Sequence, residues 1–225
     1  MQDRSYLRLI RDKGFGWMLA TQFLGALNDN VYRFIVTFYV IRHTPDQALA
    51  NEYVSLIAAL FVIPYLIFSG YAGQLADNFS KRSVLIATKS IEVVAMVLAL
   101  VAFMIGSVPL MLVIIFLMAT HSAFFSPAKY SSLPELLPDQ DLSRGTALIE
   151  MSTFLAIIIG TALAGILFQH VGDQPVLLGT IEIAIAVVGT LCSFGIGRTP
   201  EPRHRGAGCR FVSTRSATTW PRSVT

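Results

Sequence analysis

Three polar side chains recur inside the long apolar stretch at 15–41 at spacings that suit one chemical site. Gln22, Asp29 and Arg33 stand at i, i+7 and i+11, which places them on one face of a helix. Asp29 and Arg33 are four residues apart, so each can neutralise the other. A charge at membrane depth is expensive and usually faces a bundle interior or a watery cavity. Two interpretations follow: a structural ion pair that locks the helix to its neighbours, or a cavity-lining substrate or proton site, which we favour.

Further ionisable residues lie in other apolar stretches. Glu92 and Glu182 have apolar neighbourhoods that favour a protonated carboxyl group, whereas Glu150 follows Arg144 by six residues. His121 is more typical of a packed core histidine than of a proton relay. Lys129 is predicted at the cytoplasmic mouth of its helix, where it either binds an anionic headgroup or marks the membrane edge.

The segment GYAGQLADNFSKR at 70–82 carries a second pattern. Gly73, Asp77, Lys81 and Arg82 stand at i, i+4, i+8 and i+9. Asp77 falls at the predicted end of a helix, where the helix dipole disfavours an anion, so it needs a cationic or N–H partner. Lys81 and Arg82 are the nearest candidates, and Gly73 leaves room for another backbone. The simpler interpretation is an ordinary charged turn.

Composition places these residues in an all-α membrane protein. Of the 225 residues 54% are hydrophobic and 14% are charged, with a mean hydropathy of +0.61, whereas soluble domains carry roughly 25% charged residues. Two cysteines in unlike surroundings predict no disulfide framework. The sequence contains no metal-ligand cluster, nucleotide-binding glycine loop or nucleophile–base motif. We therefore predict no enzyme activity, no cofactor, no metal and no nucleic-acid partner.

Six apolar stretches have about the 20 residues that a helix needs to cross a bilayer. They run over 15–41, 53–76, 83–105, 108–127, 146–169 and 175–197. The prolines of 126–141 are expected to end the fourth helix. Small residues at four-residue intervals, Ala156, Gly160 and Ala164, predict close packing of the fifth helix. The sequence thus predicts one six-helix transmembrane domain at 15–197 after a cytoplasmic N-terminus at 1–14.

Basic residues predict the orientation of these helices. Fifteen of the 17 Lys and Arg residues, Lys89 among them, fall on the side of both termini, which the positive-inside rule makes cytoplasmic. The stretch 198–225 holds six Arg and no apolar periodicity, so we expect a disordered tail. It is either a native basic tail near anionic lipid or, as we favour, an out-of-frame or truncated end that replaces further helices.

The segment GQLADNFSKR resembles the signature between helices 2 and 3 of the major facilitator superfamily. The matching residues are Gly73, Leu75, Asp77, Lys81 and Arg82, while Asn78 and Ser80 depart from the usual basic residue and glycine. The resemblance implies a gating loop whose aspartate contacts the second half of a transporter. It also implies a fold of twelve helices in two halves, of which this chain supplies the N-terminal six.

Three other segments resemble the lysophospholipid transporter branch of that superfamily. They are QFLGALNDN at 22–30, SPAKYSSLPEL at 126–136 and ALIEMSTFLAIIIGTALAG at 147–165. The resemblance implies alternating-access movement of lysophospholipids across the inner membrane, with Asp29, Lys129 and Glu150 at cavity positions. Membrane lipids and a lysophospholipid are then the expected ligands, with a second six-helix half or a phospholipid acyltransferase as partner. The alternatives are a drug or small-solute transporter and a non-transporting, truncated membrane protein.

Overall fold

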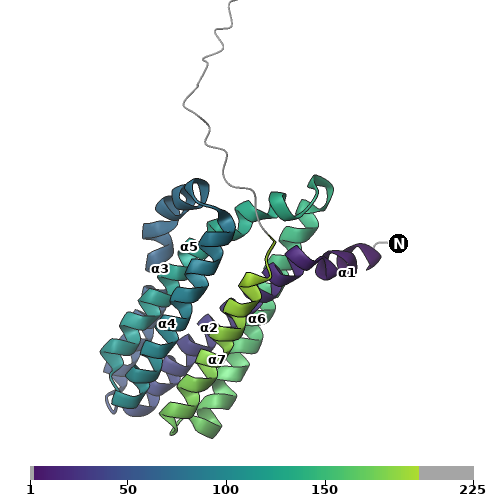
Figure 1. Ribbon diagram of the computed structural model, residues 1–225. Helices are drawn as coiled ribbons and strands as arrows, with labels where there is room; N and C mark the ends of the chain where they lie inside the picture. The colour runs from purple at the N-terminus through teal and green to yellow at the C-terminus, as the bar shows by residue number, and fades with distance from the viewer. Residues whose placement is uncertain (1–2, 198–225) are drawn as a thin grey trace, which may run out of the picture.

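The chain folds into a bundle of long helices (Figure 1). The structure is a computed structural model that describes residues 3–197, without the side chains of 3–5 and Asp77. The predicted disordered tail at 198–225 lies outside the described residues. The elements are α1 (Asp3–Arg11), α2 (Lys13–His43), α3 (Gln47–Asn78), α4 (Lys81–Ile105), α5 (Val108–Leu136), the 3₁₀ turn η1 (Asp139–Asp141), α6 (Leu142–Val171) and α7 (Pro175–Phe194).

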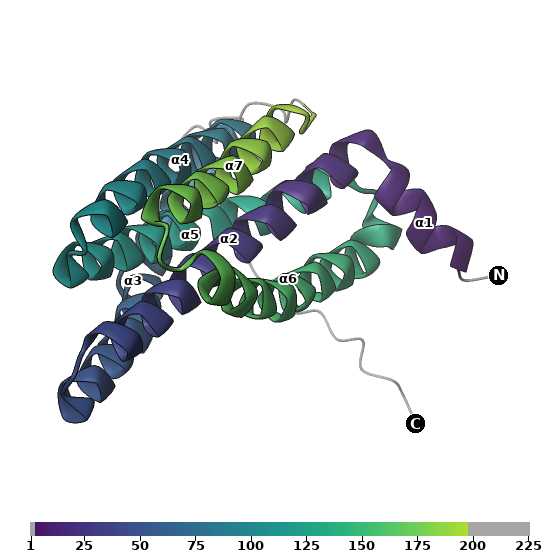
Figure 2. The same cartoon turned by 90° about the horizontal axis from the view of Figure 1, so that it is seen from below.

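Helix α2 holds the bundle together. It contacts α3, α5, α6 and α7, and Figure 2 shows it running between α6 and α7. Around it, α3 packs mainly against α5, and α4 packs against both α5 and α7. The polar residues in the middle of α2, such as Gln22, Asn28 and Asp29, therefore lie where several helices meet, and not on the bundle surface.

Five helices within residues 3–197 are long and apolar enough to cross a membrane. These candidate spans are Gln47–Ala76, Lys81–Ile105, Val108–Leu136, Asp139–Val171 and Pro175–Phe194. They match the last five of the six predicted stretches and make the chain a multi-pass membrane protein. The first predicted stretch, 15–41, lies in α2, which is not among them. Asp29, Arg33 and several side-chain amides make α2 more polar than the other long helices.

The predicted link at 128–145 is wrong. Helix α5 continues through Pro127 and Pro134 to Leu136, and α6 already begins at Leu142. A proline inside a helix costs about 3 kcal/mol or more. Here packing offsets that cost, because Ala128 and Leu133 beside the prolines are buried in one of the two apolar clusters. The longer α5 brings Lys129 and its neighbours into the bundle instead of leaving them in a loop.

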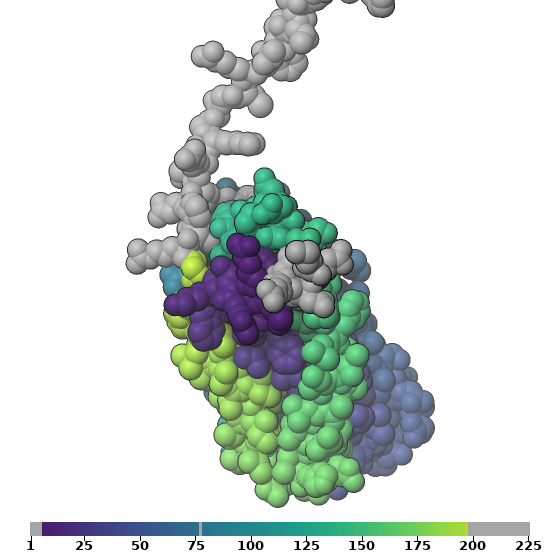
Figure 3. Space-filling model, turned by 90° about the vertical axis from the view of Figure 1, so that its right-hand side faces the viewer, coloured from purple at the N-terminus to yellow at the C-terminus, as the bar shows by residue number. Residues whose placement is uncertain are grey.

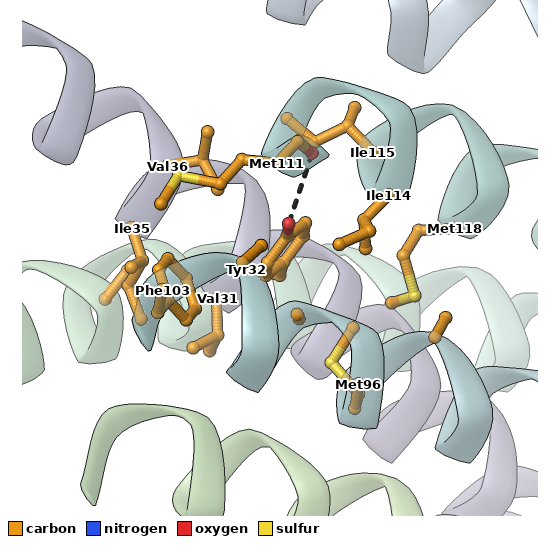
Figure 4. Packing of buried hydrophobic residues seen from close by; sticks show 14 of the residues in the cluster. Val31, Tyr32, Ile35, Val36, Met96, Phe103, Met111, Ile114, Ile115 and Met118 are labelled. Atoms are coloured by element: carbon orange, nitrogen blue, oxygen red, sulfur yellow. Dashed lines mark hydrogen bonds between the residues drawn. The ribbon is translucent and has the colours of Figure 1, made fainter. Parts of the chain in front are cut away.

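The larger apolar cluster fills the other end of the bundle. Figure 4 shows Tyr32 of α2 at its centre, with the hydroxyl donating to the Met111 carbonyl oxygen at 3.1 Å. The Phe103 ring meets the Tyr32 ring edge-on, with centroids 5.7 Å apart. The only polar group of this buried tyrosine therefore has a partner, as burial requires.

The predicted close packing of the fifth transmembrane helix is confirmed. Ala156, Gly160 and Ala164 of α6 are buried against the bundle, and α6 makes its most extensive contact with α2. A Cβ atom at Gly160 would lie 2.9 Å from the Leu27 carbonyl oxygen and 3.1 Å from Asn30 Cβ. A glycine is needed here because the α2 backbone approaches closely.

Replacing Gly160 by Ala is expected to lower the free energy of unfolding by about 1–3 kcal/mol, because the added methyl group overpacks this contact. Gly70→Ala in α3 is the matched control, since nothing lies within 4 Å of a Cβ atom there. That control is expected to be neutral or slightly stabilising, because Ala favours a helix over Gly by about 1 kcal/mol. Denaturant titration in detergent measures both, and equal stabilities of the two variants would contradict the close contact.

The predicted N-terminal segment at 1–14 contains the short helix α1. Figure 3 shows α1 on the surface at one end of the bundle, near α6 and α7. Leu9 is buried in the smaller apolar cluster, while Leu7 and Ile10 are exposed. Asp12 caps the next helix, because its Oδ1 accepts from the backbone N–H groups of Gly14 and Phe15 at 3.1 Å.

Candidate functional site

A polar cavity of about 320 Å³ lies among α2, α3, α4, α5 and α6. All five side chains predicted for a cavity line it: Gln22, Asp29, Arg33, Lys129 and Glu150. The structure therefore brings together residues that are up to 128 positions apart in the sequence. Aromatic side chains from α3 and α5 complete the wall, among them Phe61, Tyr65 and Phe125.

Asp29 is bound from α5 and not from its own helix. Its Oδ2 accepts from the Ser122 hydroxyl at 2.6 Å, and its Oδ1 lies 3.8 Å from His121 Nε2. Asp29 Oδ1 accepts no hydrogen bond from the described residues. One oxygen of this buried carboxylate thus has no hydrogen-bond donor among the described residues.

The proposed pairing of Asp29 with Arg33 is not formed. Arg33 donates to Asn30 Oδ1 at 2.7 Å, and its guanidinium lies 4.5 Å from the centroid of the Phe61 ring and 4.9 Å from that of Phe34. The Ser122 hydroxyl provides Asp29 with a short charge-assisted hydrogen bond, which a four-residue helical spacing alone does not reveal. The two charges are thus separated along the cavity wall.

Lys129 and Glu150 occupy another part of the wall. The Lys129 ammonium lies 4.5 Å from the centroid of the Tyr130 ring, and Tyr130 donates its hydroxyl to Glu150 Oε1. Lys129 is only 5% exposed and has no ion pair within residues 3–197. Arg144, which precedes Glu150 by six residues, pairs with Asp141 at 3.0 Å. The cavity therefore presents a cation and carboxylates that are not paired with each other.

A buried ion pair that the sequence did not single out supports this wall. Lys89 Nζ lies 2.5 Å from Glu92 Oε2, and Asn28 Nδ2 donates to Glu92 Oε1 at 3.1 Å. Both charged side chains are almost fully buried, so Glu92 is held by a cation rather than by apolar surroundings. The three-residue spacing of Lys89 and Glu92 is a helical pairing signal that could have revealed the pair.

Gly25 makes room for that ion pair. A Cβ atom at Gly25 would overlap Lys89 Nζ and would lie 3.7 Å from Glu92 Oε2. We expect Gly25→Ala to destabilise the chain by about 1–3 kcal/mol, because the methyl group displaces a buried ammonium group from its partner. Gly189→Ala in α7, where the nearest atom would lie at 3.4 Å, is the matched control. Thermal unfolding in detergent compares them, and a Gly25→Ala midpoint equal to that of the control would contradict this role of Gly25.

Two further predicted residues are Gln22, at the edge of the cavity, and Glu182, outside it. Gln22 donates to the Thr153 hydroxyl at 2.8 Å and so ties α2 to α6 at the cavity edge. Glu182 of α7 is fully buried outside the cavity, and neither carboxyl oxygen has a hydrogen-bond partner in the described structure. Within residues 3–197 no group of three His, Cys, Asp or Glu side chains could hold a metal.

Comparison with known proteins identifies the fold family. The family model described as Major Facilitator Superfamily matches residues 17–218. The chain belongs to the major facilitator superfamily. This is a family of transporters and not of enzymes, in agreement with the prediction from the sequence.

Curated relatives of this major facilitator chain carry the name Lysophospholipid transporter LplT. The relative from Cronobacter sakazakii is 29% identical over 213 residues, which are 92% of this chain and 50% of the relative. The relative from Citrobacter koseri is 29% identical over 183 residues, which are 81% of this chain and 42% of the relative. These matches confirm the resemblance to the lysophospholipid transporter branch. The chain spans about half the length of the curated relatives that it matches.

The superfamily signature at 73–82 lies away from the polar cavity. Gly73 faces open space, in agreement with room for another backbone, whereas the side chain of Asp77 lies outside the described residues. Lys81 forms an ion pair with Glu135 of α5. Arg82 donates to the carbonyl oxygens of Ile196 at 2.9 Å and Phe194 at 3.0 Å. The start of α4 is thereby tied to the ends of α5 and α7.

Proposed function

We propose that this chain is the N-terminal half of a lysophospholipid transporter and that the polar cavity binds the lipid headgroup. The observation that carries the proposal is the separation of charges on the cavity wall, where Lys129 faces the same space as Asp29 and Glu150. A lysophosphatidylethanolamine headgroup carries a phosphate and an ammonium group. Its two charges complement a wall whose cation and carboxylates are not paired with each other.

Lys129 is assigned to the phosphate and Asp29 to the ammonium group. Lys129 is a compact, buried cation without an ion pair among the described residues, so a phosphate oxygen would replace the water that it lost on burial. Asp29 lines the cavity, and its Oδ1 accepts no hydrogen bond in the described structure. Arg33 adds a second cation next to Asn30, at the α3 side of the cavity. The roughly apolar remainder of the wall, with Phe61 and Ile157, then meets the first carbons of the acyl chain.

The proposed topology places α2 through the membrane as a sixth span. Asp29 is buried and Arg33 lines the cavity, which is the usual arrangement for ionisable groups inside a membrane. The positive-inside rule assigns both termini to the cytoplasmic side of the inner membrane. Transporters of this kind hold their substrate between two repeats that rock against each other. The intact transporter would therefore close its cavity with a second six-helix half.

Uptake of labelled lysophosphatidylethanolamine into spheroplasts that lack their own transporter tests this function. The chain is expressed with and without a C-terminal half taken from a full-length relative. We expect uptake only when both halves are present, and loss of that uptake in Asp29→Ala. Uptake that is inhibited by cationic drugs but not by unlabelled lysophospholipid would instead favour a drug or small-solute transporter.

A further inference from the structure

An apolar groove of about 520 Å³ lies on the other side of α5 from the polar cavity, among α3, α4 and α5. Each helix contributes residues from one face: Tyr71 and Leu75 from α3, with Phe79 directly after that helix; Ser83, Val84, Ala87, Thr88 and Ile91 from α4; and Leu117, Thr120, His121 and Phe124 from α5. The three sets of residues run along their helices, so the groove is elongated along the helix axes. It is open because α3 and α4 make little contact with each other.

The hydroxyl groups on the α4 and α5 sides of the groove form hydrogen bonds within the protein. Thr88 donates its hydroxyl to the Val84 carbonyl at 2.9 Å, and Thr120 donates to the Phe116 carbonyl at 2.7 Å. Ser83 accepts from the Ser80 hydroxyl at 2.6 Å. These bonds turn methyl groups and hydrocarbon surface toward the groove. A polar ligand would find few partners there, while a hydrocarbon chain would leave these three hydroxyl groups hydrogen-bonded.

The groove lies at membrane depth and opens outward. Its α4 and α5 residues all belong to candidate membrane spans. Tyr71, Phe79 and Ile91 at its rim are more than half exposed in the protein alone. From Ser83 to Ile91 the α4 wall is about 12 Å long, at 1.5 Å per residue. An elongated apolar slot parallel to the helices has the direction that acyl chains follow in a bilayer.

We propose that this groove binds one acyl chain of a bilayer phospholipid, on the membrane side of the α3–α4 turn. The lipid is distinct from the transported molecule, whose headgroup site is on the other side of α5. The two sites share one wall residue, His121, which lines both the groove and the polar cavity. Its Nε2 lies 3.3 Å from Met118 Sδ and 3.8 Å from Asp29 Oδ1. A lipid acyl chain in the groove would therefore pack against His121, the same residue that lies next to Asp29 on the cavity side.

Photolabelling tests this inference without any transport. The chain is reconstituted in bilayers that contain phosphatidylethanolamine with a diazirine in one acyl chain, and labelled peptides are mapped by mass spectrometry. Labels are expected to concentrate on the α5 segment 117–124, at least about fivefold above the exposed α6 face of Met151, Phe154 and Ile158. Equal labelling of the two faces would overturn the proposal.

Two tryptophan variants of α4 provide the matched pair. Ala87→Trp fills the groove and is expected to reduce labelling of 117–124 at least about fivefold. Ser90→Trp stands on the same helix, is also exposed and lies outside the groove, so it is expected to leave that labelling unchanged. If Ala87→Trp does not fold, the comparison of α5 and α6 labelling in the wild type tests the proposal instead. Labelling of the groove by a photoreactive lysophospholipid but not by the diacyl lipid would assign the groove to the transported molecule and overturn the proposal.

Discussion

Replacing Lys89 by Met is expected to lower the free energy of unfolding by about 3–5 kcal/mol, because Glu92 then remains as a buried charge without its cation. The two side chains are 3% and 1% exposed, so little solvent is available to replace the missing ammonium group. Asn28 still donates to Glu92, but one hydrogen bond does not neutralise a carboxylate. Unfolding of the purified chain in mixed detergent micelles measures the difference.

A double variant separates the buried charge from the lost packing. Lys89→Met combined with Glu92→Gln removes both charges and keeps an acceptor for Asn28, so most of the lost stability should return. Lys81→Met removes the cation of the partly exposed Lys81–Glu135 pair and is expected to cost no more than about 1 kcal/mol. A Lys89→Met variant as stable as Lys81→Met would show that Glu92 is not charged in the folded chain.

Replacing Lys129 by Met is expected to weaken the binding of lysophosphatidylethanolamine about ten- to hundredfold. This range corresponds to the loss of one hydrogen bond to a charged group, about 1.5–3 kcal/mol. Met keeps the length of the side chain, so its contact with the Tyr130 ring and the shape of the wall change little. Equilibrium binding of radiolabelled lipid to the purified chain in nanodiscs is the measurement.

Lys13→Met is the matched control for Lys129→Met. Lys13 is an exposed cation at the start of α2 and does not line the cavity. Lipid binding should therefore be the same in Lys13→Met and in the wild type. If both variants weaken binding equally, the effect comes from the net charge of the chain and not from a phosphate site at Lys129.

The lengths of the apolar stretches predicted the membrane-spanning helices well. They did not predict that a helix would continue through its prolines. The sequence placed five spans that the structure also has, because a run of about 20 apolar residues leaves few other structures in a membrane. It failed at Pro127 and Pro134, where local propensity favours an end and packing of Ala128 and Leu133 overrides it. Propensity is a weak guide where tertiary contacts are this extensive.

The composition of the cavity could be predicted, but its pairings could not. Helical spacing placed Gln22, Asp29 and Arg33 on one side of α2, and all three line the cavity. The actual partner of Asp29, Ser122, is 93 residues away, so nothing in the local sequence indicates it. The i,i+4 spacing of Asp29 and Arg33 suggested a pair that does not form, because Asp29 accepts from Ser122 of α5 and Arg33 donates to Asn30 of its own helix.

The signature at 73–82 identified the family more securely than it identified a contact. Lys81 and Arg82 looked like partners for Asp77, whereas the contacts described for them reach Glu135 of α5 and the end of α7. Those partners are 54 and 114 residues distant in the chain, beyond the reach of a spacing argument. The assignment of this segment as a gate stays a prediction.

Binding of two lysophospholipids to the wild type and to Asp29→Asn tests the headgroup site most directly. Lysophosphatidylethanolamine carries an ammonium group, and lysophosphatidylglycerol has the same phosphate and acyl chain without one. We predict that Asp29→Asn weakens binding of the first lipid about tenfold or more, the loss of one charge-assisted hydrogen bond, and leaves binding of the second unchanged. An equal loss for both lipids, or no loss for either, would contradict a site in which Asp29 binds the ammonium group.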